Sequence, residues 1–255
     1  MTRGLVTKDG GTAVKADAPY RHGQTIYYFR EVRSEPESPV SETILFQDAQ
    51  ILVVDKPHGM RVTPAGDHVD RSLLSRLQRS VGNPNLAPLH RLDQETAGLI
   101  LFSVNPNTRG RYHALFANRA INRTYVAVTR SREIPSQKHW IVENRIERGE
   151  PWFRQRIVQG LPNAITRIEW RRTLGDLALF HLYPKTGRKH QLRVHMASIG
   201  FPILGDPLYP QQREPEPSDP PLQLLAYELR FIDPVTGVER AFKTSLKLAS
   251  FEGPY

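Results

Sequence analysis

The sequence predicts an α+β fold, in which a mixed β-sheet is flanked by a few helices. Runs rich in β-branched and aromatic residues recur from Ile44 onwards, and they outnumber the segments whose apolar residues have helical spacing. The helical segments fall irregularly between the strands, which argues against a regular βαβ repeat. The chain has 255 residues, a length that one sizeable core can accommodate.

The first 41 residues are predicted to be an N-terminal extension and residues 42–255 one larger domain. Residues 1–16 contain small, charged and glycine residues, and their apolar residues have no regular spacing. We therefore expect the beginning of the chain to be mobile. Residues 22–30 have the pattern of one strand, and Pro36 and Pro39 indicate a linker because proline cannot continue a strand ladder.

Seven strands and three helices are predicted in the larger domain. The strands are expected over residues 49–54, 98–104, 123–129, 164–173, 177–183, 222–232 and 239–243. The helices are expected over residues 71–77, 108–119 and 189–199. Two further segments have the composition of surface insertions. Residues 211–221 are proline-rich and acidic, as in a solvated loop, whereas residues 131–163 mix basic and aromatic side chains. That second segment fits either an RNA-contacting surface or a β-hairpin that packs its tryptophans inward.

The composition favours a polyanionic partner. The chain carries 35 Lys and Arg against 26 Asp and Glu, a formal charge of +9. Nucleic acid is the leading partner class by charge, although solubility alone also explains a basic protein. Because cysteine is absent, no thiol nucleophile or disulfide framework is available, and we expect the cytoplasm. No apolar run is long enough to predict a membrane span or a signal peptide.

The segment His90-Arg91-Leu92-Asp93-Gln94-Glu95-Thr96-Ala97-Gly98 leads into the apolar run that begins at Leu99. Such a run predicts a buried strand, and catalytic groups usually lie on the loops at strand ends. Asp93 is therefore the candidate catalytic carboxylate. Taken alone, an Arg-x-Asp triplet is more often a turn aspartate beside a surface arginine.

Four other segments accompany this one in a characteristic order. They are Asp55-Lys56-Pro57-His58-Gly59-Met60, Arg123-Thr124-Tyr125-Val126-Ala127-Val128, the segment from Thr186 to Met196, and Gly205-Asp206-Pro207-Leu208-Tyr209. Together the five motifs resemble the RluA-type family of RNA pseudouridine synthases over residues 42–248. The resemblance implies a mostly antiparallel sheet and an isomerase that converts uridine to pseudouridine in ribosomal or transfer RNA. It also implies a monomer that needs no cofactor, metal or obligate protein partner.

The resemblance assigns three residues to the chemistry. Asp93 corresponds to the essential aspartate, Arg193 to the arginine that pairs with it, and Tyr125 to the family tyrosine. A buried carboxylate tends to protonate, and a guanidinium can prevent this by gripping it through two parallel bonds. The ring of Tyr125 suits stacking on uracil better than its hydroxyl suits the role of base, because a phenol is a weak base near neutral pH.

Five further residues are expected to contact RNA, namely His90, Arg91, Lys56, Arg188 and His190. In relatives the Arg91 position is associated with holding open the gap left by an extruded uridine. His90 fits a structural hydrogen-bonding role at least as well. Lys56 lies in a Lys-Pro-x-Gly turn that should shape the pocket wall, and it is also a candidate phosphate contact.

The sequence departs from the family pattern at Ala97, where serine is frequent, and at Lys189, where Thr or Ser is common. The extension is also too short for the complete S4-type domain of many relatives. His190 and His195 are five residues apart, so they do not share a helix face as paired zinc ligands do. A non-catalytic RNA-binding protein is the main alternative. A DNA-acting enzyme is disfavoured, since no helix-turn-helix or zinc finger is visible.

Overall fold

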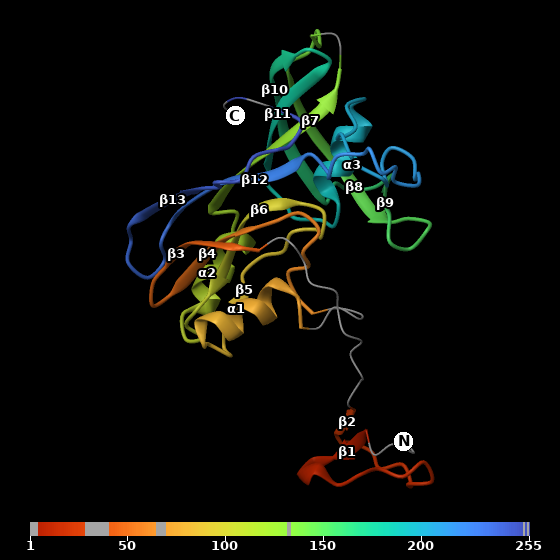
Figure 1. Ribbon diagram of the computed structural model, residues 1–255, viewed down its shortest axis with the longest axis vertical. Coiled ribbons are helices and arrows are strands. Elements are labelled where there is room, and N and C mark those ends of the chain that lie inside the picture. The colour runs from red at the N-terminus through yellow and green to blue at the C-terminus, as the bar shows by residue number, and fades with distance from the viewer. Residues whose placement is uncertain (1–4, 29–40, 65–69, 132–133, 252, 254) are drawn as a thin grey trace.

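A computed structural model of the chain describes residues 5–28, 41–64, 70–131, 134–251, 253 and 255. The predicted linker around Pro36 lies outside these residues. The strands of the larger domain form one sheet of 11 strands in the order β3-β4-β6-β12-β7-β11-β10-β8-β9, with β13 paired to β12 and β5 to β6 (Figure 1). Among the described strands, β6 and β12 form the one parallel pair and all other pairs are antiparallel. The mixed, mostly antiparallel α+β fold is therefore confirmed.

The seven predicted strands are present with bounds within two residues of those expected. They are β4 (Ile51–Lys56), β6 (Ala97–Ser103), β7 (Ile121–Arg130), β10 (Ala164–Leu174), β11 (Leu177–Pro184), β12 (Leu224–Ile232) and β13 (Glu239–Lys243). The larger sheet also contains four strands outside the seven predicted ones. The sequence does not predict β3 (Thr43–Gln47) or β5 (Ala87–Pro88), whereas β8 (His139–Arg148) and β9 (Gln155–Val158) lie in the segment for which a β-hairpin is one of two alternatives. These four are very short or lie at or next to a sheet edge, so little apolar burial marks them in the sequence.

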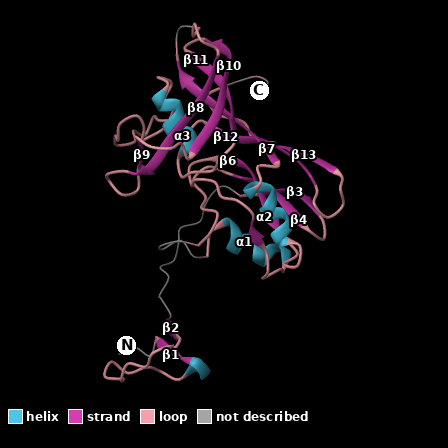
Figure 2. Cartoon of the chain, turned by 180° about the vertical axis from the view of Figure 1, so that it is seen from behind, coloured by secondary structure: helices cyan, strands magenta, loops and turns pink. Residues whose placement is uncertain are grey.

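Three helices pack against the sheet (Figure 2), and each corresponds to a predicted helix. They are α1 (Leu73–Val81), α2 (Arg109–Ala117) and α3 (Gln191–Ser198). In β4 and β6, alternate residues point to opposite faces. Leu52 and Ile100 pack in the cluster that contains Leu73 of α1, whereas Ile51 and Leu99 pack in the cluster that contains the residues of α2. The two strands are thus buried on both faces, which explains their nearly continuous apolar sequence.

Gly98 secures the parallel pairing of β6 with β12. Its φ is +107°, and a Cβ at this position would lie 2.3 Å from the carbonyl oxygen of Ala226. Only glycine allows two backbones to approach so closely. The glycine that ends the Asp93 motif therefore fixes the strand that follows the loop.

The extension contains more regular structure than the sequence predicts. β1 (Val6–Lys8) pairs with β2 (Ile26–Tyr28) in a separate two-stranded sheet, and a 3-10 turn spans Asp9–Gly11. β2 lies within the strand expected over residues 22–30, whereas β1 falls in the segment for which we expect none. The partner strand of β1 lies far along the chain, so no local pattern indicates it. No helix in the described part of the chain is long and apolar enough to cross a membrane.

Residues 134–163 contain the β8–β9 hairpin, which corresponds in part to one of the two alternatives for this segment. Trp140 packs against Phe180 and Phe201 at the edge of the core. Trp152 instead is 65% exposed, at the turn between the two strands. The hairpin thus turns one of these two tryptophans inward and leaves the other on the surface.

Candidate active site

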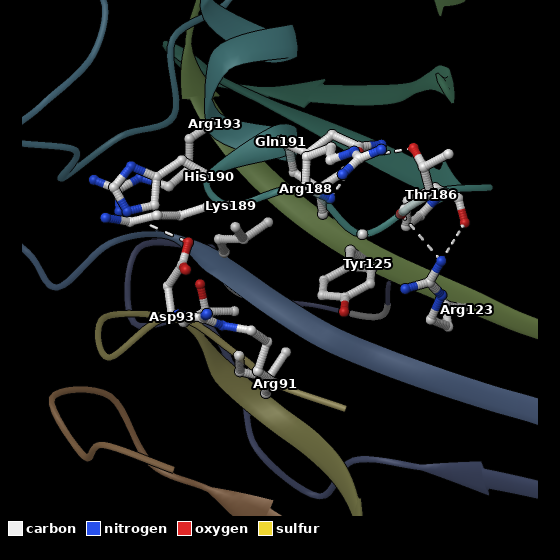
Figure 3. A pocket seen from close by; sticks show the side chains of 16 residues that line it. Arg91, Asp93, Arg123, Tyr125, Thr186, Arg188, Lys189, His190, Gln191 and Arg193 are labelled. Carbon is white, nitrogen blue, oxygen red and sulfur yellow. Dashed lines mark hydrogen bonds and ion pairs between the residues drawn. The ribbon is translucent and has the colours of Figure 1, made fainter. Parts of the chain in front are cut away.

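A pocket with about 550 Å³ of open space lies where the loop before β6, strand β7 and the loop leading into α3 meet (Figure 3). One carboxylate and five cationic side chains line it: Asp93, Arg91, Arg123, Arg188, Lys189 and Arg193. Tyr125 and His190 also face the pocket. The fold thus gathers six of the eight predicted catalytic or RNA-contacting residues in one place and leaves out Lys56 and His90.

The loop that carries Asp93 is hydrogen-bonded to the Lys-Pro-x-Gly turn, residues 56–59. The Nζ of Lys56 donates to the carbonyl oxygens of Pro57, Met60 and Gln94 at 2.9–3.0 Å. Nδ1 of the His58 ring lies 2.6 Å from the carbonyl oxygen of Glu95. Both contacts fix the peptide groups that directly follow Asp93, so this turn positions the carboxylate.

Lys56 has no free N–H group with which to contact a phosphate. Its side chain is completely buried, and its three ammonium protons are all used on backbone carbonyls. Burial lowers the pKa of Lys56 to about 7, although the carboxylates of Glu95 and Asp93 oppose that change. The predicted phosphate contact is therefore corrected to a positioning role, whereas the expected part of the turn in shaping the pocket agrees with its hydrogen bonds.

Arg193 is gripped by Asp206. The Nε and Nη2 atoms of Arg193 donate to the two carboxylate oxygens of Asp206 at 2.8 and 2.6 Å. Both side chains are at most 1% exposed. Asp206 also accepts the backbone N–H groups of Leu208 and Tyr209. The carboxylate is thus fully hydrogen-bonded, as a buried ion pair requires.

Arg193 approaches Asp93 through its remaining nitrogen. Nη1 lies 3.9 Å from Oδ2 of Asp93 and 3.8 Å from Oε2 of Glu95. Both distances exceed the hydrogen-bond range, and Nη1 is buried without a hydrogen-bond partner among the described residues. The expected bidentate bond between Arg193 and Asp93 is therefore wrong: the two bonds go to Asp206, and Asp93 receives a longer-range ion pair.

The environment of Asp93 favours its protonated form. Burial raises the pKa of the carboxyl, and the charges of Arg193, Arg91, Lys189 and Lys56 oppose this rise only in part. Burial is the largest of these effects, and Arg193 opposes it from 3.9 Å while its short bonds go to Asp206. The sequence predicts that one cation keeps the carboxylate ionised, yet the net shift of its pKa is upward.

Tyr125 lies on β7 in the middle of the sheet, paired with Leu182 of β11 on one side and Ala226 of β12 on the other. Its side chain is 7% exposed and turns toward the pocket (Figure 3). Burial raises the pKa of its phenol, and the charge of Arg123 opposes this. The hydroxyl is therefore neutral near pH 7. The central strand holds the aromatic ring in place, and the ring forms part of the pocket wall.

The loop before α3 is fixed by side chains that the sequence analysis does not single out. Gln191 accepts from the N–H of Arg188 and from the hydroxyl of Thr186, and donates to Ile165 and Thr166 of β10. These bonds tie the start of α3 to the sheet. The signal in the sequence is weak, because a glutamine at a helix start usually faces solvent.

His190 has a left-handed backbone with a φ of +54°. Its Nδ1 lies 2.9 Å from the hydroxyl of Tyr209, which also accepts the N–H of Gln155. The Tyr209 hydroxyl still has its proton to donate, and donation to Nδ1 places the ring proton on Nε2. Burial, with the neighbouring Arg193 and Lys189, lowers the pKa of His190 to about 3. The imidazole is a neutral part of the pocket wall.

His90 lies outside the pocket lining. Its Nε2 accepts the backbone N–H of Leu101 at 3.0 Å, and its ring stacks on Phe116. Burial, together with the charge of Arg123, lowers the pKa of His90 to about 3. These contacts fit the structural alternative for His90.

His195 is also structural, with Nδ1 near Thr166 and Nε2 near Asn144. Among the residues that the structure describes, no three His, Cys, Asp or Glu side chains are grouped as metal ligands.

The part of the chain that builds most of the pocket matches a known family. Residues 50–198 match the family model described as RNA pseudouridylate synthase. This region includes Asp93, Tyr125 and Arg193, whereas Asp206 lies beyond its end.

Individual relatives extend the likeness over most of the chain. An uncharacterized RNA pseudouridine synthase of Synechocystis is 30% identical over 91% of this chain and 82% of its own length. The ribosomal large subunit pseudouridine synthase D of Zymomonas mobilis is 32% identical over 85% of this chain and 73% of its own. The tRNA pseudouridine synthase C of Vibrio parahaemolyticus is 28% identical over 82% of this chain and 92% of its own.

Among solved structures, human RNA pseudouridylate synthase domain containing 1 is similar, with a TM-score of 0.64 and 27% identity. The match covers 82% of this chain and 85% of the human one.

Proposed function

The chain belongs to the RNA pseudouridylate synthase family, and from this premise we propose that Asp93 is the carboxylate with which it isomerises particular uridines of ribosomal or transfer RNA. The family match confirms the resemblance found in the sequence and identifies the chain as an isomerase. The observation that carries the proposal for Asp93 is the composition of the pocket. Among the described residues that line it, Asp93 is the one carboxylate, and a buried tyrosine and five cations surround it.

The reaction sets clear demands on the pocket. The bond from N1 of uracil to C1′ of ribose breaks, the base rotates, and a bond from C5 to C1′ forms. A proton leaves C5 and a proton is gained at N1, so the product is an isomer. The base must stay in place while it is detached, which a walled pocket achieves.

Asp93 supplies the one oxygen nucleophile or proton acceptor with a carboxylate's strength among the described residues of this pocket. It can add to the substrate or assist removal of a proton from the sugar, and both routes use the ionised form. Its raised pKa disfavours that form. Nη1 of Arg193, which has no hydrogen-bond partner in the described ranges, is placed to stabilise the carboxylate once the two approach.

Tyr125 supports the base during rotation. Its ring is rigidly held in β7, and a neutral aromatic face can stack on uracil in either orientation of the base. Its hydroxyl is also a neutral O–H group in a pocket whose other titratable groups, apart from Asp93 and neutral His190, are cations. We assign it to proton relay as well as stacking.

The cations at the rim fit an extruded nucleotide. Arg91 and Arg188 are exposed and Lys189 is half-buried at the mouth of the pocket. Phosphates on either side of a flipped uridine carry negative charge that such side chains neutralise. Arg91, two residues before Asp93, occupies the position of the residue that holds the vacated stack open.

Ribosomal and transfer RNA are both proposed as substrate classes, because relatives named for each are similar to this chain. We also propose residues 42–255 as the catalytic unit, acting as a monomer. The large sheet begins with β3 at Thr43, and the pocket is built within that sheet and its loops.

The test is pseudouridine mapping in cells that lack the gene, by carbodiimide labelling and primer extension. The cells are rescued with the native protein, Asp93→Asn or Glu95→Gln. Glu95 is the matched control, because its carboxylate is also within 4 Å of Arg193 Nη1 yet it does not line the pocket. We expect the native protein and Glu95→Gln to restore a missing site and Asp93→Asn to restore none. Restoration by Asp93→Asn would exclude Asp93 as the catalytic residue and favour a non-catalytic RNA-binding role.

A further inference from the structure

Two hollows adjoin the candidate active site and form one continuous surface, which we call the basic groove. The first hollow shares residues 186–188 with the active-site pocket. The second shares Arg123 and Pro184 with that pocket. The two hollows meet at Arg119 and Lys185, which line both. The groove thus leads away from the site where the target nucleotide would sit.

The charge of the basic groove is of one sign. Among the described residues, no aspartate or glutamate lines either hollow. Arg119 and Lys185 are both exposed, and neither side chain makes an ion pair or a hydrogen bond with another residue in the described ranges. The fold therefore leaves these two cations free to bind an anion.

The other cations of the groove are already engaged. Arg167 pairs with Glu169. Arg123 donates to the backbone carbonyl of Pro184, and Arg188 donates to that of Asn163. Arg119 and Lys185 thus differ from their neighbours, because nothing in the described protein orients or neutralises them.

The backbone at Arg119 is unusual. Helix α2 ends in a Schellman motif, in which the N–H of Arg119 bonds to the carbonyl of Phe116 and the N–H of Ala120 to that of Leu115, at 3.3 and 2.8 Å. Arg119 takes the left-handed position of this motif, with a φ of +57°. Glycine is the usual residue there, because a Cβ is disfavoured in this conformation. The charge of Arg119 is compatible with the C-terminal end of the helix dipole, but its backbone bears a conformational cost that glycine would avoid.

We propose that the basic groove binds the phosphate backbone of the RNA strand next to the target uridine, with Arg119 and Lys185 as its main contacts. The inference rests on the proposed function, since it assumes that the pocket takes a nucleotide. A strand that leaves the pocket must continue over the surface, and this surface is hollow, lined by two unpaired cations and, in its described part, free of acids. Such contacts bind RNA regardless of sequence, so they position the substrate.

Arg119→Gly tests the groove, because it removes the cation and relieves the left-handed strain. We expect its Tm to equal or exceed that of the native protein. The full-length protein is titrated with a fluorescein-labelled oligouridylate of about twelve nucleotides, a length in the range of single-strand binding sites. Arg119→Gly should raise Kd about threefold, and Arg119→Gly with Lys185→Ala about tenfold. The slope of log affinity against log salt should fall by about 0.7 for each phosphate that the variant no longer neutralises.

Arg111→Ala is the matched control, because Arg111 is an exposed cation of the same helix that lines neither hollow. A Kd and salt slope of the double variant equal to those of Arg111→Ala would overturn the proposal. Binding is measured without turnover, so this result is distinct from failure of the proposed function. That failure would appear as absence of pseudouridine formation by the native protein, whatever the groove variants bind.

Discussion

Arg193 forms its two short hydrogen bonds with Asp206 and points only its third nitrogen, Nη1, toward Asp93 at 3.9 Å. Arg193 is thus shared between a structural carboxylate and the candidate catalytic one. Asp206 holds the guanidinium plane in place and neutralises much of its charge. The remaining N–H groups are left to interact with Asp93 or with substrate.

Asp206→Asn is expected to lower both stability and turnover. The variant leaves the buried Arg193 without its counter-charge, and breaking a buried ion pair from one side costs about 3 kcal/mol. Urea unfolding measures this loss. The kcat should fall more than KM rises, because Arg193 no longer keeps its orientation toward Asp93 although the RNA-binding rim is intact.

Asp219→Asn is the matched comparison, since Asp219 pairs with Arg213 on the surface. Exposed pairs contribute at most about 1 kcal/mol. If both variants lose the same small stability, or if Asp206→Asn keeps its native kcat, Asp206 does not act through Arg193.

Lys56→Met tests the turn beneath the Asp93 loop. Methionine fills similar space but leaves three buried carbonyls without a donor, at a cost of about 3 kcal/mol in total. The peptide that follows Asp93 should loosen, and kcat should fall at least tenfold. Lys247→Met removes an exposed lysine and should change neither quantity. Native turnover in a folded Lys56→Met protein would mean that the turn does not position Asp93.

The sequence predicted the fold and the gathering of the pocket well, for identifiable reasons. Strands such as β4 and β6 are buried on both faces, so continuous apolar runs mark them. Asp93, Tyr125 and Arg193 lie in motifs whose order resembles a known family, and the chain does bring them together. Edge strand β3 carries a weaker signature, since its apolar run is only the three residues Ile44, Leu45 and Phe46, none of them fully buried.

The partners of the charged residues could not be predicted in the same way. Asp206 lies in one of the five motifs. Nothing in the sequence, however, shows that its carboxylate accepts both short hydrogen bonds of Arg193. Lys56 is a cation in a turn next to the pocket, which favoured a phosphate contact, yet its side chain is fully buried. Both outcomes depend on which atoms face each other across loops distant in sequence, and residue spacing along one element carries no such information.

Tyr125→Phe and Tyr125→Leu separate stacking from proton relay. Phenylalanine keeps the aromatic face, so RNA affinity should remain within about threefold of native, while kcat falls about a hundredfold because the hydroxyl is gone. Leucine removes the ring, and KM should then rise about tenfold as well. Single-turnover rates and Kd for a substrate RNA give both quantities. A native kcat in Tyr125→Phe would restrict the residue to stacking.

The acid stability of the protein should depend on His90. Its pKa is lowered to about 3, first by burial, and its Nε2 must stay unprotonated to accept the N–H of Leu101. Between pH 6.5 and 3, His90 is therefore protonated in the unfolded chain but not in the folded protein. The free energy of unfolding falls as the pH falls through this range. His90→Gln presents an amide oxygen near the position of Nε2 and does not titrate. It should be less stable than the native protein at pH 7, and the difference should shrink by up to about 1.4 kcal/mol per pH unit below 6.5.

Urea unfolding of both proteins at pH 7, 6 and 5 measures this gap in their free energies of unfolding. A gap that stays constant over this range would mean that His90 is protonated as easily in the folded protein as in the unfolded chain, and its assignment as a neutral structural acceptor would fail.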